Sequence, residues 1–188
     1  MQPVFVLYLQ LIMKKIFYIL AVSLFSVVGC TKPEKAPTSG TATIDNTVYV
    51  STSYYSIGFS FSQAKMISNM KTPGPDITVY VNKDTSPYRL IFQANNLLPS
   101  FFKYGEFADE AAAIAAFNSL TTFTASQFSD MADPLRPNQI WIYRSGSGLY
   151  TKIRIISTVN EMRQDVAFGE CKFQWVYQPD GSTTFPPQ

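Results

Sequence analysis

Alternating hydrophobic and polar positions fill most of the chain beyond residue 41, and they predict β-strands. In residues 54–62 and 166–178 every second side chain is large or apolar, while small or polar side chains lie between them. The apolar faces consist of Tyr55, Ile57, Phe59 and Phe61 in the first segment and Cys171, Phe173, Trp175 and Tyr177 in the second. A period of two is typical of antiparallel strands that bury one face.

Shorter segments of β-branched and aromatic residues predict further strands and the turns between them. These segments are residues 47–52, 77–81, 88–94, 140–144 and 149–158. Residues 145–148 (SGSG) separate two of them and predict the clearest hairpin in the chain. Residues 82–87 (NKDTSP) are a second turn-rich connection.

One segment has the pattern of a helix. Residues 110–120 (EAAAIAAFNSL) are rich in Ala, the strongest helix former, and Asp109 precedes them as an N-cap. One face of this helix carries Ala113, Ile114, Phe117 and Leu120. This face is spaced for packing on a sheet.

Together these elements predict a mainly β fold: an antiparallel sandwich or barrel-like sheet with one covering α-helix. Residues 41–188 are expected to form a single β-rich domain, because a chain of this length buries one sizeable core. We find no internal repeat in the sequence.

The N-terminal segment predicts a lipoprotein signal peptide over residues 1–29. Lys14 and Lys15 precede an apolar run over residues 16–28, and Gly29 and Cys30 follow it. The run is shorter than the about 20 residues of a transmembrane helix. Cys30 is therefore expected to become the first mature residue and to carry the lipid. An ordinary secretory signal with a chance cysteine and an uncleaved anchor are the alternatives.

Two boundaries accompany this prediction. Translation is expected to start at Met13, because Met13 directly precedes the two lysines. Residues 30–40 are expected to be a flexible tether, since residues 31–40 (TKPEKAPTSG) are rich in Pro, Thr, Ser and Lys. A lipid anchor is expected to hold the protein at a membrane outside the cytoplasm.

Composition argues against several functional classes. The chain has no histidine, which excludes Ser-His and Cys-His catalytic pairs and the common zinc sites. Without Lys14 and Lys15 the basic and acidic side chains balance, so nucleic acid is not an expected partner. Residues 145–148 lack the lysine of a phosphate-binding loop. We therefore do not expect an enzyme. Cys171, left without a disulfide partner, is expected to be a small core residue.

The C-terminal third resembles the HmuY-like haem-binding lipoproteins of Bacteroidetes. The resemblance rests on residues 140–144 (IWIYR), 148–155 (GLYTKIRI) and 173–185 (FQWVYQPDGSTTF), which are similar to the family's last strands. Asp76-Ile77 is similar to an Asp-Ile pair that precedes a strand in the family. The resemblance covers residues 140–185 well and residues 41–139 in outline.

This resemblance implies a protein anchored at the outer membrane, on its periplasmic or its cell-surface face. Such a protein captures haem, or another tetrapyrrole, and passes it to an outer-membrane receptor. The family's best-studied pockets use paired histidines, which this chain lacks. Met131, in the irregular segment 129–134, is the preferred candidate for an iron ligand, because a thioether is a soft axial ligand. Tyr104 is the second candidate, because a tyrosinate also binds haem iron. Both side chains also suit a core role. Met66, Met70 and Met162 are expected at the surface or in turns.

Two other functional classes stay open. A glycan-binding or adhesion module would use exposed aromatic side chains without iron ligands. An accessory lipoprotein would pack against an outer-membrane receptor. The sequence does not decide among these three, and haem capture is preferred because only it has support from individual residues.

Overall fold

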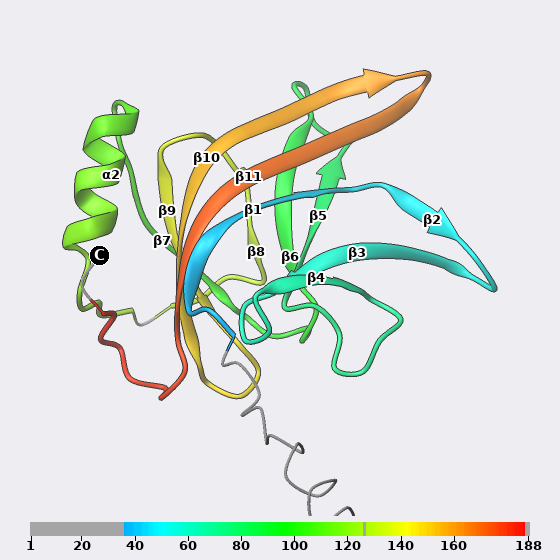
Figure 1. The fold of residues 1–188 in the computed structure, drawn as a ribbon. Helices are drawn as coiled ribbons and strands as arrows, with labels where there is room; N and C mark the ends of the chain where they lie inside the picture. The colour runs from blue at the N-terminus through cyan, green and yellow to red at the C-terminus, as the bar shows by residue number, and fades with distance from the viewer. Residues whose placement is uncertain (1–35, 126, 187–188) are drawn as a thin grey trace, which may run out of the picture. The chain divides into compact units, whose positions relative to one another are not determined.

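Eleven strands and one helix occur in the part of the chain that the computed structural model describes, residues 36–125 and 127–186 (Figure 1). The strands are β1 (Ser39–Asp45), β2 (Val48–Val50), β3 (Tyr54–Ser60), β4 (Lys65–Ser68), β5 (Ile77–Asn82), β6 (Arg89–Ala94), β7 (Phe101–Glu106), β8 (Met131–Ala132), β9 (Gln139–Arg144), β10 (Tyr150–Arg163) and β11 (Val166–Gln178). The helix is α2 (Glu110–Ser119). The predicted mainly β, antiparallel fold with one helix is confirmed.

The strands form two sheets. The first sheet has the order β1-β11-β10-β9-β7, and the second has the order β2-β3-β5-β6-β8, with β4 paired to β3. All pairings are antiparallel, both between strands joined by short turns, such as β9 and β10, and between strands far apart in the sequence, such as β1 and β11. The predicted hairpin at residues 145–148 joins β9 to β10, with Ile153 opposite Trp141.

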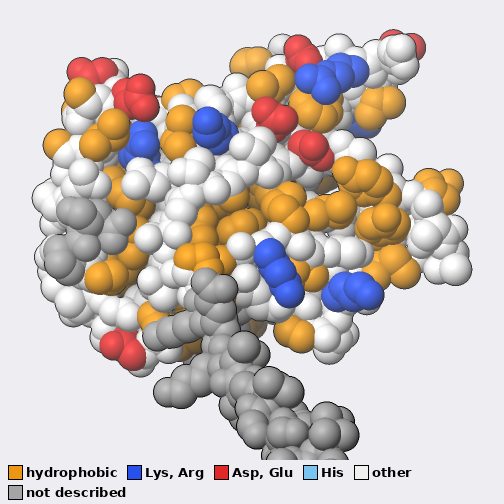
Figure 2. Space-filling model, viewed as in Figure 1, with side chains coloured by type: hydrophobic (Ala, Val, Ile, Leu, Met, Phe, Trp, Pro, Cys, Tyr) orange, Lys and Arg blue, Asp and Glu red, His pale blue; other side chains and the backbone are white. Residues whose placement is uncertain are grey.

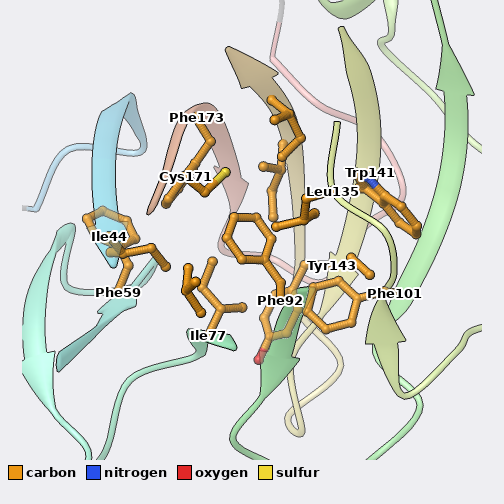
Figure 3. Packing of buried hydrophobic residues seen from close by; sticks show 14 of the residues in the cluster. Ile44, Phe59, Ile77, Phe92, Phe101, Leu135, Trp141, Tyr143, Cys171 and Phe173 are labelled. Carbon is orange, nitrogen blue, oxygen red and sulfur yellow. The ribbon is translucent and has the colours of Figure 1, made fainter. Parts of the chain in front are cut away.

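The main core lies between the two sheets and consists largely of the alternating apolar residues (Figure 3). Phe173 of β11 is fully buried, and its ring lies 5.7 Å from Phe59 and 5.4 Å from Phe92, both of the second sheet. Cys171 lies in the same cluster and is fully buried. Cys171 is therefore a core residue as expected, and burial raises the pKa of its thiol well above the usual range.

A smaller core joins the helix to the other face of the first sheet. Asp109 caps the helix as predicted, because its Oδ1 accepts a hydrogen bond of 2.8 Å from the Ala112 amide. Phe117 and Leu120 are buried against Ile140 and Val176. The helix thus covers the sheet as expected, although Ile114 of the predicted apolar face is 37% exposed.

Two hairpins extend beyond the core as arms (Figure 1). The first, residues 48–56, consists of β2 and the start of β3. The second, residues 158–170, consists of the outer parts of β10 and β11. Its turn residues Gln164 and Asp165 have φ angles of 47° and 66°. Positive φ at both central residues is the geometry of a tight two-residue hairpin.

The structure also corrects some predicted boundaries. β1 begins at Ser39, so the ordered strand starts inside the segment predicted as tether. β1, β4, β7 and β8 were not predicted, and β10 continues to Arg163 instead of ending at residue 158. Met162 therefore lies in a strand and not in a turn. Cys30 and the predicted signal peptide lie outside the described residues. Among residues 36–125 and 127–186, no helix has the length and hydrophobicity needed to cross a membrane.

Candidate functional site

A cleft lies where the second sheet divides. β3 pairs with β5 only at Phe59 and Ile77, and beyond this point the two strands diverge. The β10–β11 arm passes over the gap (Figure 1). The resulting space, which we call the fork cleft, has a volume of about 630 Å³. It is lined by Asn46, Thr47, Val48, Ser56, Thr78, Val79, Tyr80, Val81, Lys83, Gln93, Arg163, Val166, Ala167 and Phe168.

Asn46 fixes one wall of the fork cleft. Its side-chain amide donates to the carbonyl oxygen of Ala167 at 2.8 Å, and its Oδ1 accepts from the Gly169 amide at 2.8 Å. The Asn46 backbone amide also donates to the Gly169 carbonyl at 3.0 Å. These three bonds join the connection between β1 and β2 to β11. They therefore hold the bases of the two arms together at the bottom of the cleft.

Gly169 brings the two sheets close together beneath the cleft. A Cβ atom at this position would overlap the side chains of Leu90 and Val81 on the second sheet. Only glycine permits this approach without displacing its neighbours. The close contact between β11 and the β5–β6 pair therefore sets the floor of the cleft.

The walls of the fork cleft are mainly apolar. Figure 2 shows hydrophobic side chains gathered in the hollow between the two arms. Val48 and Val166 are 60% and 66% exposed, which is unusual for side chains of this kind. Exposed apolar residues that line a hollow mark a binding site more often than scattered ones do. The shape and lining of the cleft therefore fit a ligand with an apolar body.

Two cationic side chains complete the lining. The Arg163 guanidinium lies 3.4 Å from the centre of the Phe168 ring and is paired with Glu161 at 2.6 Å. Lys83, directly after β5, makes no ion pair within the described residues. A ligand that carries carboxylates would find Lys83 free to pair with it.

The structure places the two candidate iron ligands elsewhere. Met131 lies in the short edge strand β8 opposite Gln93, and its side chain is 39% exposed. Tyr104 lies in β7 at a bulge between Lys103 and Gly105, and it is 43% exposed. Neither residue lines the fork cleft. Within the segment 129–134, which was expected to be irregular, only Met131 and Ala132 form a strand. No hydrogen bond that we find among the described residues joins the side chains of Met131 and Tyr104.

The donor set of the fork cleft does not fit an iron-ligated haem through Met131 or Tyr104. The lining contains no methionine and no cysteine, and its only phenol is that of Tyr80, which is 49% exposed. No cluster of three or more Cys, Asp or Glu side chains suited to a metal ion occurs among the described residues. The cleft is therefore better suited to an apolar, acid-bearing body than to coordination of a metal.

Sequence reasoning did not single out Tyr80, Lys83 or Arg163. Tyr80 and Lys83 lie in and directly after β5, whereas Arg163 lies about 80 residues later at the end of β10, and each alone looks like an ordinary exposed residue. One sequence signal for this cleft was Val166, which directly follows the polar residues of a hairpin turn, because an apolar residue at a hairpin tip has no core to enter.

Comparisons with known proteins add no relative. No family model matches the chain, and no curated protein is similar to it in sequence. The resemblance of residues 140–185 to the HmuY-like proteins therefore stays a prediction.

Proposed function

We propose that this protein is a membrane-anchored lipoprotein that captures a tetrapyrrole, the class of ligand that the resemblance implies. The fork cleft holds the ligand by its flat apolar body and its acidic groups, without a bond from Met131 or Tyr104 to iron. The observation that carries this proposal is a cleft of about 630 Å³ with apolar walls and two cations in its lining. Lipid attachment at Cys30 holds the protein at the outer membrane.

The size and chemistry of the cleft support this ligand class. Sites for small molecules and cofactors have volumes of roughly 300–1,000 Å³ and are lined mainly by apolar and aromatic side chains. Each Å² of apolar surface that the ligand buries contributes about 25 cal/mol. The apolar lining offers surface against which a porphyrin can pack, while Lys83, which makes no ion pair within the described residues, pairs with a propionate.

A haemin titration of the purified protein tests this proposal. We expect a saturable change in the Soret absorbance at one equivalent. Lys83→Glu reverses the charge in the lining of the cleft, so affinity should fall about tenfold, equivalent to about 1.4 kcal/mol. Lys172→Glu is the matched control, because Lys172 is also exposed but lies outside the cleft. Absence of saturable binding, or equal losses in both variants, contradicts the proposal.

A further inference from the structure

A second cavity differs in character from the fork cleft. It has a volume of about 370 Å³ and lies between the β4–β5 connection, the β6–β7 connection, the end of β9 and the β9–β10 turn. Its polar side chains are those of Asn69, Lys71, Asp76, Asn95, Asn96 and Tyr143. It shares no lining residue with the fork cleft, so what it binds is independent of the function proposed above.

Asp76 and Tyr143 form the inner wall, and the hydrogen bonds between them are long. The Tyr143 hydroxyl lies 3.3 Å from the Asp76 carbonyl oxygen and 3.4 Å from its Oδ1, whereas bonds from hydroxyl groups are usually about 2.7–2.8 Å. The other carboxylate oxygen of Asp76 accepts a short bond of 2.7 Å from the Phe61 amide. The Oδ1 atom and the Tyr143 hydroxyl can thus both form better bonds with a ligand.

Burial dominates the electrostatics of Asp76. It raises the pKa of the carboxyl group above 3.8, although hydrogen bonds from Phe61, Ser60, Tyr143 and Ser62 act in the opposite direction. Asp76 makes no ion pair within the described residues. A donor that enters the cavity and reaches Oδ1 would replace part of the hydration that burial removed.

The outer wall supplies donors. Asn69 uses its Oδ1 to accept from the Ser56 amide at 3.2 Å, and its amide nitrogen has no partner within the described residues. Lys71 is exposed and forms no ion pair there. Asn95 and Asn96 use their amide groups on Pro75 and Ser100, at 3.1 and 3.0 Å. The cavity therefore combines the Asp76 carboxylate with two side chains, Asn69 and Lys71, whose donor groups have no partner within the described residues.

This arrangement excludes several ligand classes. A divalent cation needs more acidic ligands than Asp76 alone provides. An anion would meet the Asp76 carboxylate, and an apolar ligand would leave the surrounding amide and carboxylate groups unpaired. A neutral molecule with neighbouring hydroxyl groups satisfies both walls, because a hydroxyl both donates and accepts. We propose that this cavity binds one unit of a neutral saccharide.

The test uses a panel of neutral monosaccharides and short oligosaccharides made from them, with binding measured by calorimetry and by saturation-transfer NMR. We expect at least one sugar to bind saturably with millimolar affinity. Asn69→Asp keeps the acceptor for the Ser56 amide but removes the donor to the ligand, so it should weaken binding at least tenfold. Lys71→Ala removes the second donor without disturbing any hydrogen bond described above, and it should also weaken binding.

Asn82→Asp is the matched control. Asn82 likewise accepts a backbone bond, from the Asp84 amide at 2.9 Å, but it lies outside the cavity. Sugar binding should be unchanged in this control and in Lys83→Glu, which separates this site from the fork cleft. The proposal is overturned if no sugar in the panel binds saturably. It is equally overturned if Asn69→Asp and Lys71→Ala, both with wild-type circular dichroism, bind sugar as the wild type does.

Discussion

Lys152 of β10 donates a hydrogen bond of 2.7 Å from its Nζ to the carbonyl oxygen of Phe117 in the last turn of α2. A second bond of 2.9 Å reaches the carbonyl oxygen of Leu120, the C-cap residue. The helix has no basic residue in its own last turn, so a lysine from the sheet beneath supplies the charge that favours a helix C-terminus. The Nζ also lies 4.7 Å from the centre of the Phe117 ring.

This contact predicts a dependence of stability on alkaline pH. Burial lowers the pKa of Lys152 from 10.5 to about 8. Between these values the unfolded chain binds more protons at this position than the folded protein does. The free energy of unfolding should therefore gain up to about 3 kcal/mol from Lys152 as pH rises through this window, since a tenfold change in proton affinity is equivalent to about 1.4 kcal/mol.

Urea unfolding at several pH values from 7 to 10.5 measures this effect, with Lys152→Met as the comparison. The variant keeps an apolar side chain of similar length but cannot titrate. Other groups, such as Cys171, ionise in both proteins, so the difference in slope isolates Lys152. Parallel curves for the two proteins would show that Lys152 does not have a lowered pKa. At neutral pH the lost helix-terminal bonds should cost the variant roughly 1–3 kcal/mol, less the relief of removing a buried charge.

For Asp76 we expect the opposite dependence at acidic pH: its contribution to stability should decrease as pH rises. Its raised pKa means that the folded protein binds more protons than the unfolded chain just above pH 3.8. The contribution of Asp76 to the free energy of unfolding should therefore fall as pH rises through that window. Asp76→Asn keeps an oxygen for the Phe61 amide but removes the titration. As pH rises from 3.5 to 6, the free energy of unfolding of the wild type should decrease relative to that of the variant. A difference that is independent of pH would refute the raised pKa.

The close approach at Gly169 predicts a large cost for a single methyl group. Gly169→Ala would force the new Cβ into Leu90 and Val81, and overpacking of this kind costs about 1–3 kcal/mol. Gly40→Ala is the control, because a Cβ there would meet Trp175 at an ordinary contact distance of 3.5 Å. Thermal unfolding of both variants tests this. Equal melting temperatures would mean that the sheets separate easily at this point.

The sequence predicted the parts of the fold in which one face of an element is buried along its whole length. β11 has the predicted bounds of residues 166–178, and its alternation is clean because every second side chain enters the core. The helix matches within one residue because Asp109 and the alanine run determine it locally. In these segments, local pattern and tertiary packing agree.

The unpredicted elements depend on tertiary pairing. β7 (residues 101–106) contains a bulge that breaks its alternation, and β8 has only two residues, which pair with β6. The outer part of β10, which continues to Arg163, is exposed, so no hydrophobic pattern marks it. The fork cleft was hidden for a related reason. It exists because β3 and β5 diverge after the Phe59–Ile77 pair, and no local pattern records where two strands separate.

The most direct test of the central claim compares haemin with metal-free protoporphyrin IX as ligands of the wild-type protein. Because the proposed site holds the porphyrin plane and its propionates, both ligands should bind saturably, with affinities within about tenfold of each other. Lys83→Glu should weaken both to a similar extent. Tight binding of haemin together with no binding of protoporphyrin IX would contradict the account, because it would show that a bond to iron holds the ligand.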